Sequence, residues 1–112
     1  MCLFCKIAAK QISSRILFED PLLLAFHDIN PVAPTHVLVI PKQHLTSLSE
    51  AQPEHADLFG KLLLAAAHAA SLTGIAQTGY RVVANTGPDA GQSVFHIHIH
   101  VLGGRQMAWP PG

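Results

Sequence analysis

Three histidines occupy every second position near the C-terminus, in the stretch HIHIH at residues 96–100. Side chains alternate between the two faces of a β-strand, so the three imidazoles are expected on one face, about 6.5–7 Å apart along the chain. That face should look outward or into a cleft. The apolar residues between them should pack against the core on the opposite face, namely Phe95, Ile97, Ile99 and Val101.

The spacing favours separate roles for these histidines over a single metal cage. His96 and His100 would lie roughly 13 Å apart on a straight strand, too far to meet at one zinc ion through bonds of about 2 Å. An imidazole titrates near neutral pH and can act as a nucleophile or handle protons. Its attack on phosphorus gives a P–N bond that water can later cleave. A hydrolase that binds catalytic zinc with the histidine run is a rival interpretation.

A glycine-rich loop directly precedes the histidines, with the sequence GPDAGQSV at residues 87–94. Phosphoryl chemistry needs donors for the phosphate oxygens. Gly87, Gly91 and the hydroxyl of Ser93, with exposed backbone N–H groups, could supply them. A plain connection between two strands is the alternative, but the position of the loop favours the functional interpretation.

Cys2 and Cys5 form a C-x-x-C pair at the N-terminus. A disulfide is disfavoured in a reducing compartment, and no βαβ pattern surrounds the pair to support a redox role. Two ordinary buried thiols at the start of a helix, or one half of a metal site, are the interpretations that stay open.

The composition describes a globular chain without a strongly charged surface. Of 112 residues, 49% are apolar and 12% are charged, and seven basic residues balance seven acidic ones. No charge block predicts binding to nucleic acid or to an anionic membrane, and the apolar stretch at 62–72 is too short to span a bilayer. The N-terminus lacks the pattern of a secretory signal, so a cytoplasmic location is expected.

The elements that must position these residues are short strands and one long helix. Asp20-Pro21 is a turn signal that predicts a hairpin, while Pro53 and Gly74 suit the first turn and the C-terminal end of a helix. These features predict a single α+β domain over residues 1–112, with a mainly antiparallel sheet. The expected elements are a short helix at 2–11, strands at 15–20, 22–28, 36–41, 80–85 and 93–102, and a long helix at 53–74.

The long helix is apolar on more than one side, because Leu62, Leu63 and Leu64 are followed by a run of alanines. One face of a sheet cannot cover all of these positions, so a second subunit is a plausible cover and a homodimer is expected. The alternative to a dimer is that the alanines lie on a solvent-exposed face of the helix, which their small side chains allow.

The stretch HIHIHVL resembles the signature of the histidine triad nucleotide-binding proteins, His-x-His-x-His followed by apolar residues. The similarity extends to FCKI, AFHDINPVAPTHVLVIPKQH, RVVANTG, GQSVFHIHIHVLGGRQM and WPPG, which begin at residues 4, 25, 81, 91 and 109. The tail and Ser93 resemble the purine nucleoside phosphoramidase branch rather than the dinucleoside polyphosphate hydrolase branch.

The resemblance implies a homodimer of histidine triad domains, each with a five-stranded sheet, one long helix and one short helix. It implies binding of purine nucleoside monophosphates and hydrolysis of the P–N bond in adenosine phosphoramidates and adenylated amines, which releases AMP. His98 matches the nucleophile of the family, His100 lines the site near the phosphate, and His36 belongs to the network that positions the nucleophile. Ser93 matches a phosphate-side position and, with His100, is a candidate proton donor.

The remaining binding positions also follow from the resemblance. Asp28 matches the carboxylate that binds the ribose hydroxyls. The backbone N–H of Val94, with Asn85 and Gln92, matches the phosphate side. The apolar purine slot corresponds to Phe4, Ile7, Phe26 and Ile29, and Trp109 matches a tail residue that approaches the site of the partner subunit. His27, His55 and His68 are expected to be structural or solvent-facing.

Some members of the wider superfamily bind structural zinc at four positions that correspond here to Cys2, Cys5, His44 and His96. Two thiolates and two imidazoles form a suitable tetrahedral shell, so structural zinc is a candidate cofactor. No acidic cluster is available for catalytic Mg²⁺, and catalysis is expected to need no cofactor. Two rival functions stay open: a dinucleoside polyphosphate hydrolase, and a nucleotide-binding regulatory module with residual activity.

Overall fold

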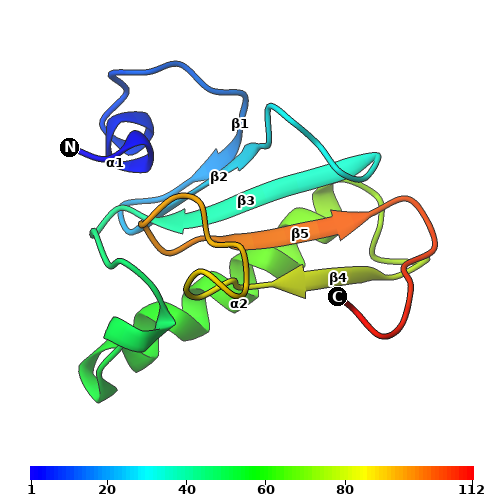
Figure 1. Ribbon diagram of the computed structural model, residues 1–112. Coiled ribbons are helices and arrows are strands. Elements are labelled where there is room, and N and C mark those ends of the chain that lie inside the picture. The colour runs from blue at the N-terminus through cyan, green and yellow to red at the C-terminus, as the bar shows by residue number, and fades with distance from the viewer.

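The computed structural model describes residues 1–112. Its five strands form one sheet in the order β1-β2-β3-β5-β4 (Figure 1). Each pair of neighbouring strands is antiparallel, as predicted. The strands are β1 (Ile16–Glu19), β2 (Leu23–His27), β3 (Thr35–Pro41), β4 (Tyr80–Val83) and β5 (Ile99–Gly103).

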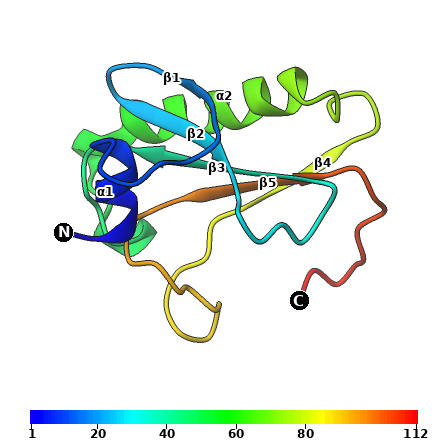
Figure 2. The same cartoon turned by 90° about the horizontal axis from the view of Figure 1, so that it is seen from above.

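Two helices pack on opposite faces of this sheet (Figure 2). The long helix α2 (Ala56–Leu72) runs across one face, and the short helix α1 (Leu3–Ala8) lies at one end of the other. Two short 3₁₀ turns, Leu48–Glu50 and Pro53–His55, lead into α2. The face that carries α1 also carries the functional residues described below.

The alternation of side chains along the central strands builds a core on each face. In β3, Val37 and Val39 face α2, whereas Leu38 and Ile40 face α1. The stripe of α2 that packs on the sheet is made of Leu62 and alanines, which allow a close approach: Ala65, Ala66, Ala69 and Ala70. The smaller core under α1 contains Phe4, Ile7, Leu24, Phe26, Leu38 and Ile40.

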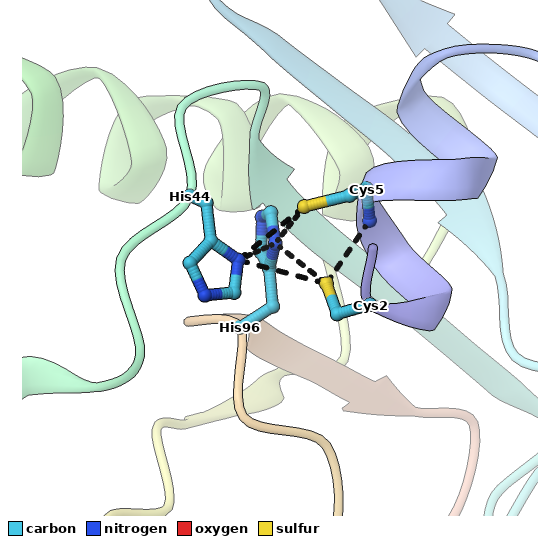
Figure 3. A group of neighbouring side chains, drawn as sticks. All are labelled: Cys2, Cys5, His44 and His96. Carbon is cyan, nitrogen blue, oxygen red and sulfur yellow. Dashed lines mark hydrogen bonds between the residues drawn. The ribbon is translucent and has the colours of Figure 1, made fainter.

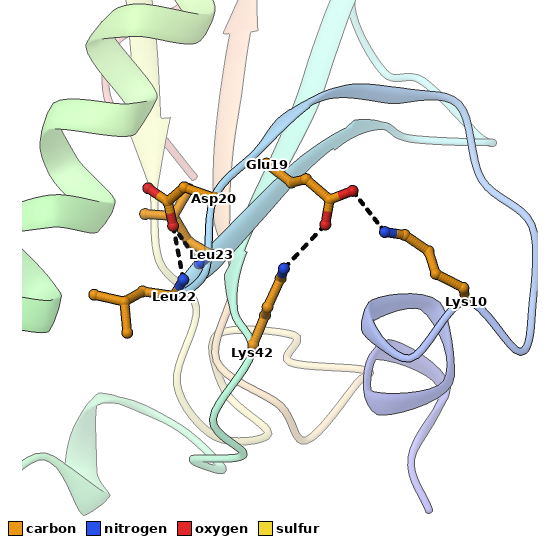
Figure 4. A network of polar contacts seen from close by, with 6 residues as sticks. All are labelled: Lys10, Glu19, Asp20, Leu22, Leu23 and Lys42. Carbon is orange, nitrogen blue, oxygen red and sulfur yellow. Dashed lines mark hydrogen bonds and ion pairs between the residues drawn. The ribbon is translucent and has the colours of Figure 1, made fainter.

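Local signals in the sequence end β1 and α2 within two residues of the predicted positions. Asp20 Oδ1 accepts hydrogen bonds from the N–H groups of Leu22 and Leu23, which forms the turn between β1 and β2 (Figure 4). Gly74 adopts φ +80°, a left-handed conformation that terminates the helix at little cost for glycine.

The carboxylate of Glu19 ties α1 to the sheet (Figure 4). Its Oε1 forms an ion pair with Nζ of Lys10, just beyond α1, at 2.6 Å. Its Oε2 forms a second ion pair with Nζ of Lys42, just beyond β3, at 3.0 Å. The two lysines hold the pKa of Glu19 below its ordinary value. All three side chains are partly exposed to solvent, so each pair contributes little to stability and chiefly fixes the direction of the connection.

The prediction of a strand at 93–102 is wrong for residues 93–98, which lie before β5. The strand begins only at Ile99, opposite Val39, although β3 continues to Pro41. The N–H of Ile97 donates to the carbonyl of Leu45 at 2.6 Å instead of continuing the ladder. Phe95 is 59% exposed and does not pack in the core, while His96 is completely buried rather than facing outward or into a cleft.

The outer side of α2 is apolar and uncovered in the single chain. Leu63 is 57% exposed and Leu64 is 72% exposed. On the edge strand β4, Tyr80 and Val82 are exposed as well. Neither helix has the length and hydropathy that a membrane crossing requires.

Candidate functional site

A cavity of about 1020 Å³ opens on the face of the sheet that carries α1. It has an apolar part, formed by Phe4, Ile7, Phe26 and Ile29, and a polar part that contains most of the predicted catalytic groups. The structure thus places these predicted residues on one cavity: Phe4, Ile7, Phe26, Asp28, Ile29, Ser93, Val94, His98 and His100.

His98 is held in one orientation by its own backbone neighbour. Its Nδ1 lies 2.7 Å from the carbonyl oxygen of His96, which can only accept a hydrogen bond. The proton of the neutral ring is therefore assigned to Nδ1, and Nε2 keeps its lone pair. Nε2 has no hydrogen-bond partner within the chain, and the ring lines the cavity, so this nitrogen is free to attack a ligand.

His36 and His100 meet because they are diagonal neighbours on adjacent strands. Leu38 of β3 lies opposite His100 of β5, so His36, two residues earlier, shares the same face. The N–H of Val32 donates to His36 Nδ1 at 3.2 Å, which places the His36 proton on Nε2. Nε2 then donates to His100 Nδ1 at 2.9 Å, and Asp28 Oδ2 lies 3.3 Å away.

This hydrogen-bond chain leaves His100 with its proton on Nε2, as a donor. The ligating atoms of Asp28, His36 and His100 lie close enough to hold a cation. His36 would have to lose its Nε2 proton for that, because its other nitrogen is already occupied by Val32. The three residues therefore form a hydrogen-bond chain rather than a metal site.

The three histidines of the run face different partners, which argues against a zinc hydrolase built on the run. His96 Nδ1 faces the two cysteines and His44, His98 Nδ1 faces the carbonyl of residue 96, and His100 Nδ1 faces His36. No single ion could join these nitrogens.

Burial keeps the histidine pair neutral near pH 7. Desolvation, together with the smaller effects of the nearby His98 and His36, lowers the pKa of His100 to about 4, while Asp28 opposes the shift. Desolvation also lowers the pKa of His36, again against the opposing effect of Asp28. Both rings therefore act as neutral hydrogen-bonding groups at physiological pH.

These shifts predict a loss of stability at acidic pH. The unfolded chain binds a proton at His100 near the ordinary pKa of 6.5, whereas the folded chain does so only near 4. Because the unfolded state binds more protons between these values, the free energy of unfolding should fall as the pH is lowered from about 6.5 to about 4.

Urea unfolding across this pH range, with chelator present throughout, checks the prediction. His100→Asn should show a clearly shallower dependence on pH, while His55→Asn, at a histidine outside the cavity, should keep the slope of the original protein. An unchanged slope in His100→Asn would show that its burial does not control acid stability.

The glycine-rich loop is pinned by the side chain of Gln92, which is buried. Its Oε1 accepts from the N–H of Gly87 at 3.0 Å, and its Nε2 donates to the carbonyls of Thr46 at 2.7 Å and Val94 at 3.2 Å. Gln92 therefore holds the backbone on which Ser93 and Val94 reach the cavity, and its own side chain does not line it.

Four of the residues predicted for catalysis and nucleotide binding do not line the cavity in the single chain. His36 is buried beside His100, Gln92 is buried against the loop, and Asn85 is half-buried on the loop after β4. Trp109 is 81% exposed on the C-terminal tail, where the guanidinium of Arg81 lies 5.9 Å from its ring centroid. Arg81 also donates to the carbonyl of Ala108 at 2.9 Å and so fixes the tail.

Sequence reasoning missed the residues that complete the cavity wall. Leu38 could have been found, because strand alternation puts it on the face of His36. Ser13, Ser14 and Arg15 line the cavity from the loop before β1, and His27 lines it from the end of β2. Nothing local in the sequence shows that this loop folds over the sheet.

A second group of side chains lies beside the cavity, at the N-terminal end of α1 (Figure 3). The CCHH cluster consists of Cys2 just before α1, Cys5 on α1, His44 from the segment after β3, and His96 from the segment before β5. Each cysteine Sγ lies 3.3–3.6 Å from the Nδ1 atoms of both histidines, and these two Nδ1 atoms are 3.1 Å apart.

These separations fit a tetrahedral zinc shell. With Zn–N bonds of about 2.05 Å and Zn–S bonds of about 2.3 Å, the expected separations are about 3.3 Å between nitrogens and about 3.6 Å between nitrogen and sulfur. His96 Nε2 donates to the carbonyl of Pro41 at 2.8 Å, which leaves the lone pair of Nδ1 directed at the thiols. Metal-binding histidines are commonly oriented by such a hydrogen bond to a carbonyl.

Comparisons with known proteins agree with this architecture. A family model described as HIT domain matches residues 9–107. The 14 kDa zinc-binding protein of Zea mays is 53% identical over 112 residues, which cover 98% of this chain and 87% of the maize protein. The adenylylsulfatase HINT1 of Arabidopsis thaliana is 51% identical over 112 residues, covering 98% of this chain and 76% of that protein.

Solved structures are also similar to this chain. The HIT family hydrolase from Legionella pneumophila Philadelphia 1 superimposes with a TM-score of 0.98 and 47% identity, and each chain is covered completely. A histidine triad protein from Clostridium difficile has a TM-score of 0.92 and 43% identity, covering 96% of this chain and 93% of its own. The chain belongs to the HIT domain family.

Proposed function

We propose that this protein hydrolyses the P–N bond of adenosine phosphoramidates and adenylated amines and releases AMP. The observation that carries the proposal is the orientation of His98, whose Nδ1–H is fixed on the His96 carbonyl while its Nε2 is unpaired in a ring that lines the cavity. Similarity to HIT family hydrolases supports a hydrolytic reaction on a nucleotide.

The reaction proceeds in two displacements at phosphorus. His98 Nε2 attacks the phosphorus atom and the P–N bond to the amine breaks. The amine leaves with a proton, for which Ser93 and His100 are the candidate donors, and a nucleotidyl-histidine remains. Water then attacks the same phosphorus, returns a proton to that donor, and the bond to His98 breaks, so that AMP is released with the imidazole restored. Ser93, the N–H of Val94 and the Nε2–H of His100 stabilise the phosphate oxygens as charge develops on them.

The rest of the nucleotide occupies the apolar part of the cavity. The purine lies between Phe4, Ile7, Phe26 and Ile29, where burial and aromatic contact hold it without reading its edge. Asp28 accepts hydrogen bonds from the ribose hydroxyls. Asn85 and Gln92 support the phosphate side, Gln92 through the loop backbone, and Trp109 reaches the site of a second subunit.

Sulfate is a second leaving group to compare with an amine, because one relative is named an adenylylsulfatase. Sulfate leaves without a proton, whereas an amine must be protonated to leave. Multiple-turnover release of AMP should therefore be measured with adenosine phosphoramidate, adenylyl sulfate and a diadenosine polyphosphate. The proposal expects the highest kcat/KM with the phosphoramidate. Binding of AMP without turnover of any of them would instead indicate a nucleotide-binding module.

The CCHH cluster is proposed to hold one structural zinc ion. The ligand distances and the orientation of His96 fit the ion, and the maize relative is named a zinc-binding protein. When bound, zinc supplies cross-links between α1 and the two segments that carry His44 and His96. It takes no part in the reaction at phosphorus.

The protein is proposed to be a homodimer. The exposed leucines of α2 and the exposed apolar residues of edge strand β4 offer a surface that a second copy would cover. Sedimentation in dilute buffer should give about twice the 12.0 kDa mass of the chain. A clean monomer at micromolar concentration would contradict the proposal.

A further inference from the structure

The CCHH cluster and the nucleophile are joined through the backbone of His96. The carbonyl of this residue accepts the Nδ1–H of His98 at 2.7 Å and so selects the reactive form of that ring. The side chain of the same residue is fixed at both nitrogens, by Pro41 on one side and by the CCHH cluster on the other. A metal bond at His96 would therefore restrain the carbonyl that orients His98.

A second link runs through Phe4, a residue of α1 that lies between Cys2 and Cys5 in the sequence. Its ring meets the ring of His98 edge-on, with centroids 5.0 Å apart and an interplanar angle of 88°. It also meets Phe26 at 5.6 Å, in the apolar part of the cavity. Phe4 is 5% exposed, so it cannot shift without disturbing both neighbours.

The position of Phe4 depends on α1, which is a weak element by itself. The helix has only six residues, too few to be stable without tertiary contacts. Beyond its C-terminal end it is attached by the exposed ion pair between Lys10 and Glu19, which contributes little. Phe4 and Ile7 attach it to the small core on the sheet, and at its N-terminal end the polar attachment is the CCHH cluster, through Cys2 and Cys5.

We propose that zinc in the CCHH cluster positions the nucleophile and the purine slot, so that zinc binding and nucleotide binding strengthen each other. Phe4 and the His96 carbonyl transmit the effect. This inference rests on the proposed nucleotide and zinc sites, and it makes Phe4 a positioning residue for His98 as well as a wall of the slot.

Reciprocity gives a test on the full, zinc-loaded protein. If zinc strengthens AMP binding, saturating AMP must strengthen zinc binding by the same factor, here expected to be about tenfold. A competitive chelator titration with and without AMP measures the zinc affinity directly. Any capture of free zinc by AMP would act in the opposite direction, so it cannot imitate the expected result.

Two matched variants separate the coupling from a general loss of binding. Phe4→Leu and Phe26→Leu each remove one aromatic ring from the slot and should both weaken AMP binding in calorimetry. With AMP raised to saturation for each variant, Phe26→Leu should retain the effect of AMP on zinc affinity, whereas Phe4→Leu should lose most of it. Equal retention in both variants would overturn the role of Phe4.

Nitrogen NMR of the histidine rings supplies the second measurement. With zinc and without nucleotide, His98 should show a single Nδ1–H form, and stripping the zinc should introduce the Nε2–H form.

An unchanged zinc affinity with AMP bound would overturn the coupling even if the enzyme turns over phosphoramidates. A zinc effect on AMP binding and on His98 without turnover would support the coupling and refute the proposed reaction. Failure to bind AMP would overturn both.

Discussion

His98→Asn is expected to lower kcat for phosphoramidate hydrolysis by at least about 10⁴-fold, because it removes the attacking atom. Asparagine keeps an N–H group that can donate to the carbonyl of His96, so the cavity should stay intact. The variant should therefore still bind AMP. Steady-state kinetics and calorimetry on the same preparation measure the two properties.

The matched control is His100→Asn, which removes a donor to the phosphate but leaves the nucleophile. Loss of one such donor usually costs about 10²–10³-fold in kcat. The difference between the two variants separates nucleophilic attack from stabilisation of charge. If His98→Asn kept more than about a tenth of the original activity, His98 would not be the nucleophile.

Cys5→Ser is expected to lose zinc and to lower the free energy of unfolding by several kcal/mol. Structural zinc contributes about 10–16 kcal/mol of binding free energy in zinc-finger peptides. Only part of that should be lost here, since the sheet and α2 have a core of their own on the far face. Elemental analysis of protein purified without a His tag should find close to one zinc per chain in the original protein and almost none in the variant.

A pair of histidine variants controls for the loss of an imidazole as such. His44→Asn removes a predicted ligand of the CCHH cluster and should lose zinc. His68→Asn removes an exposed histidine on α2 and should keep it. Zinc content that stays the same in Cys5→Ser and His44→Asn would contradict the assignment of the cluster.

The pattern of residue types predicted the fold class, an α+β domain with a mainly antiparallel sheet. Asp20 and Pro21 mark the hairpin, Pro53 and Gly74 mark the ends of the long helix, and the short apolar runs predict the strands. Resemblance to histidine triad proteins placed Cys2 and Cys5 with two distant histidines, and the structure brings these four residues together.

The orientation of the functional groups could not be predicted in the same way. The contacts that orient His36, His96 and His98 come from backbone groups, the N–H of Val32 and the carbonyls of residues 41 and 96. Backbone groups are the same at nearly every position, so residue types do not reveal them. The strand prediction failed before Ile99 for a related reason, since alternation identifies faces only while the hydrogen-bonded ladder continues.

Trapping the covalent intermediate tests the central claim most directly. The protein should be mixed with adenosine phosphoramidate, quenched within milliseconds in base, where the histidine–phosphorus bond survives, and mapped by mass spectrometry. The account predicts one adenylyl group per chain on the peptide containing residues 96–100, with fragmentation that places it on His98. An adenylyl group on His96 or His100, or a burst of AMP with unmodified protein, would contradict it.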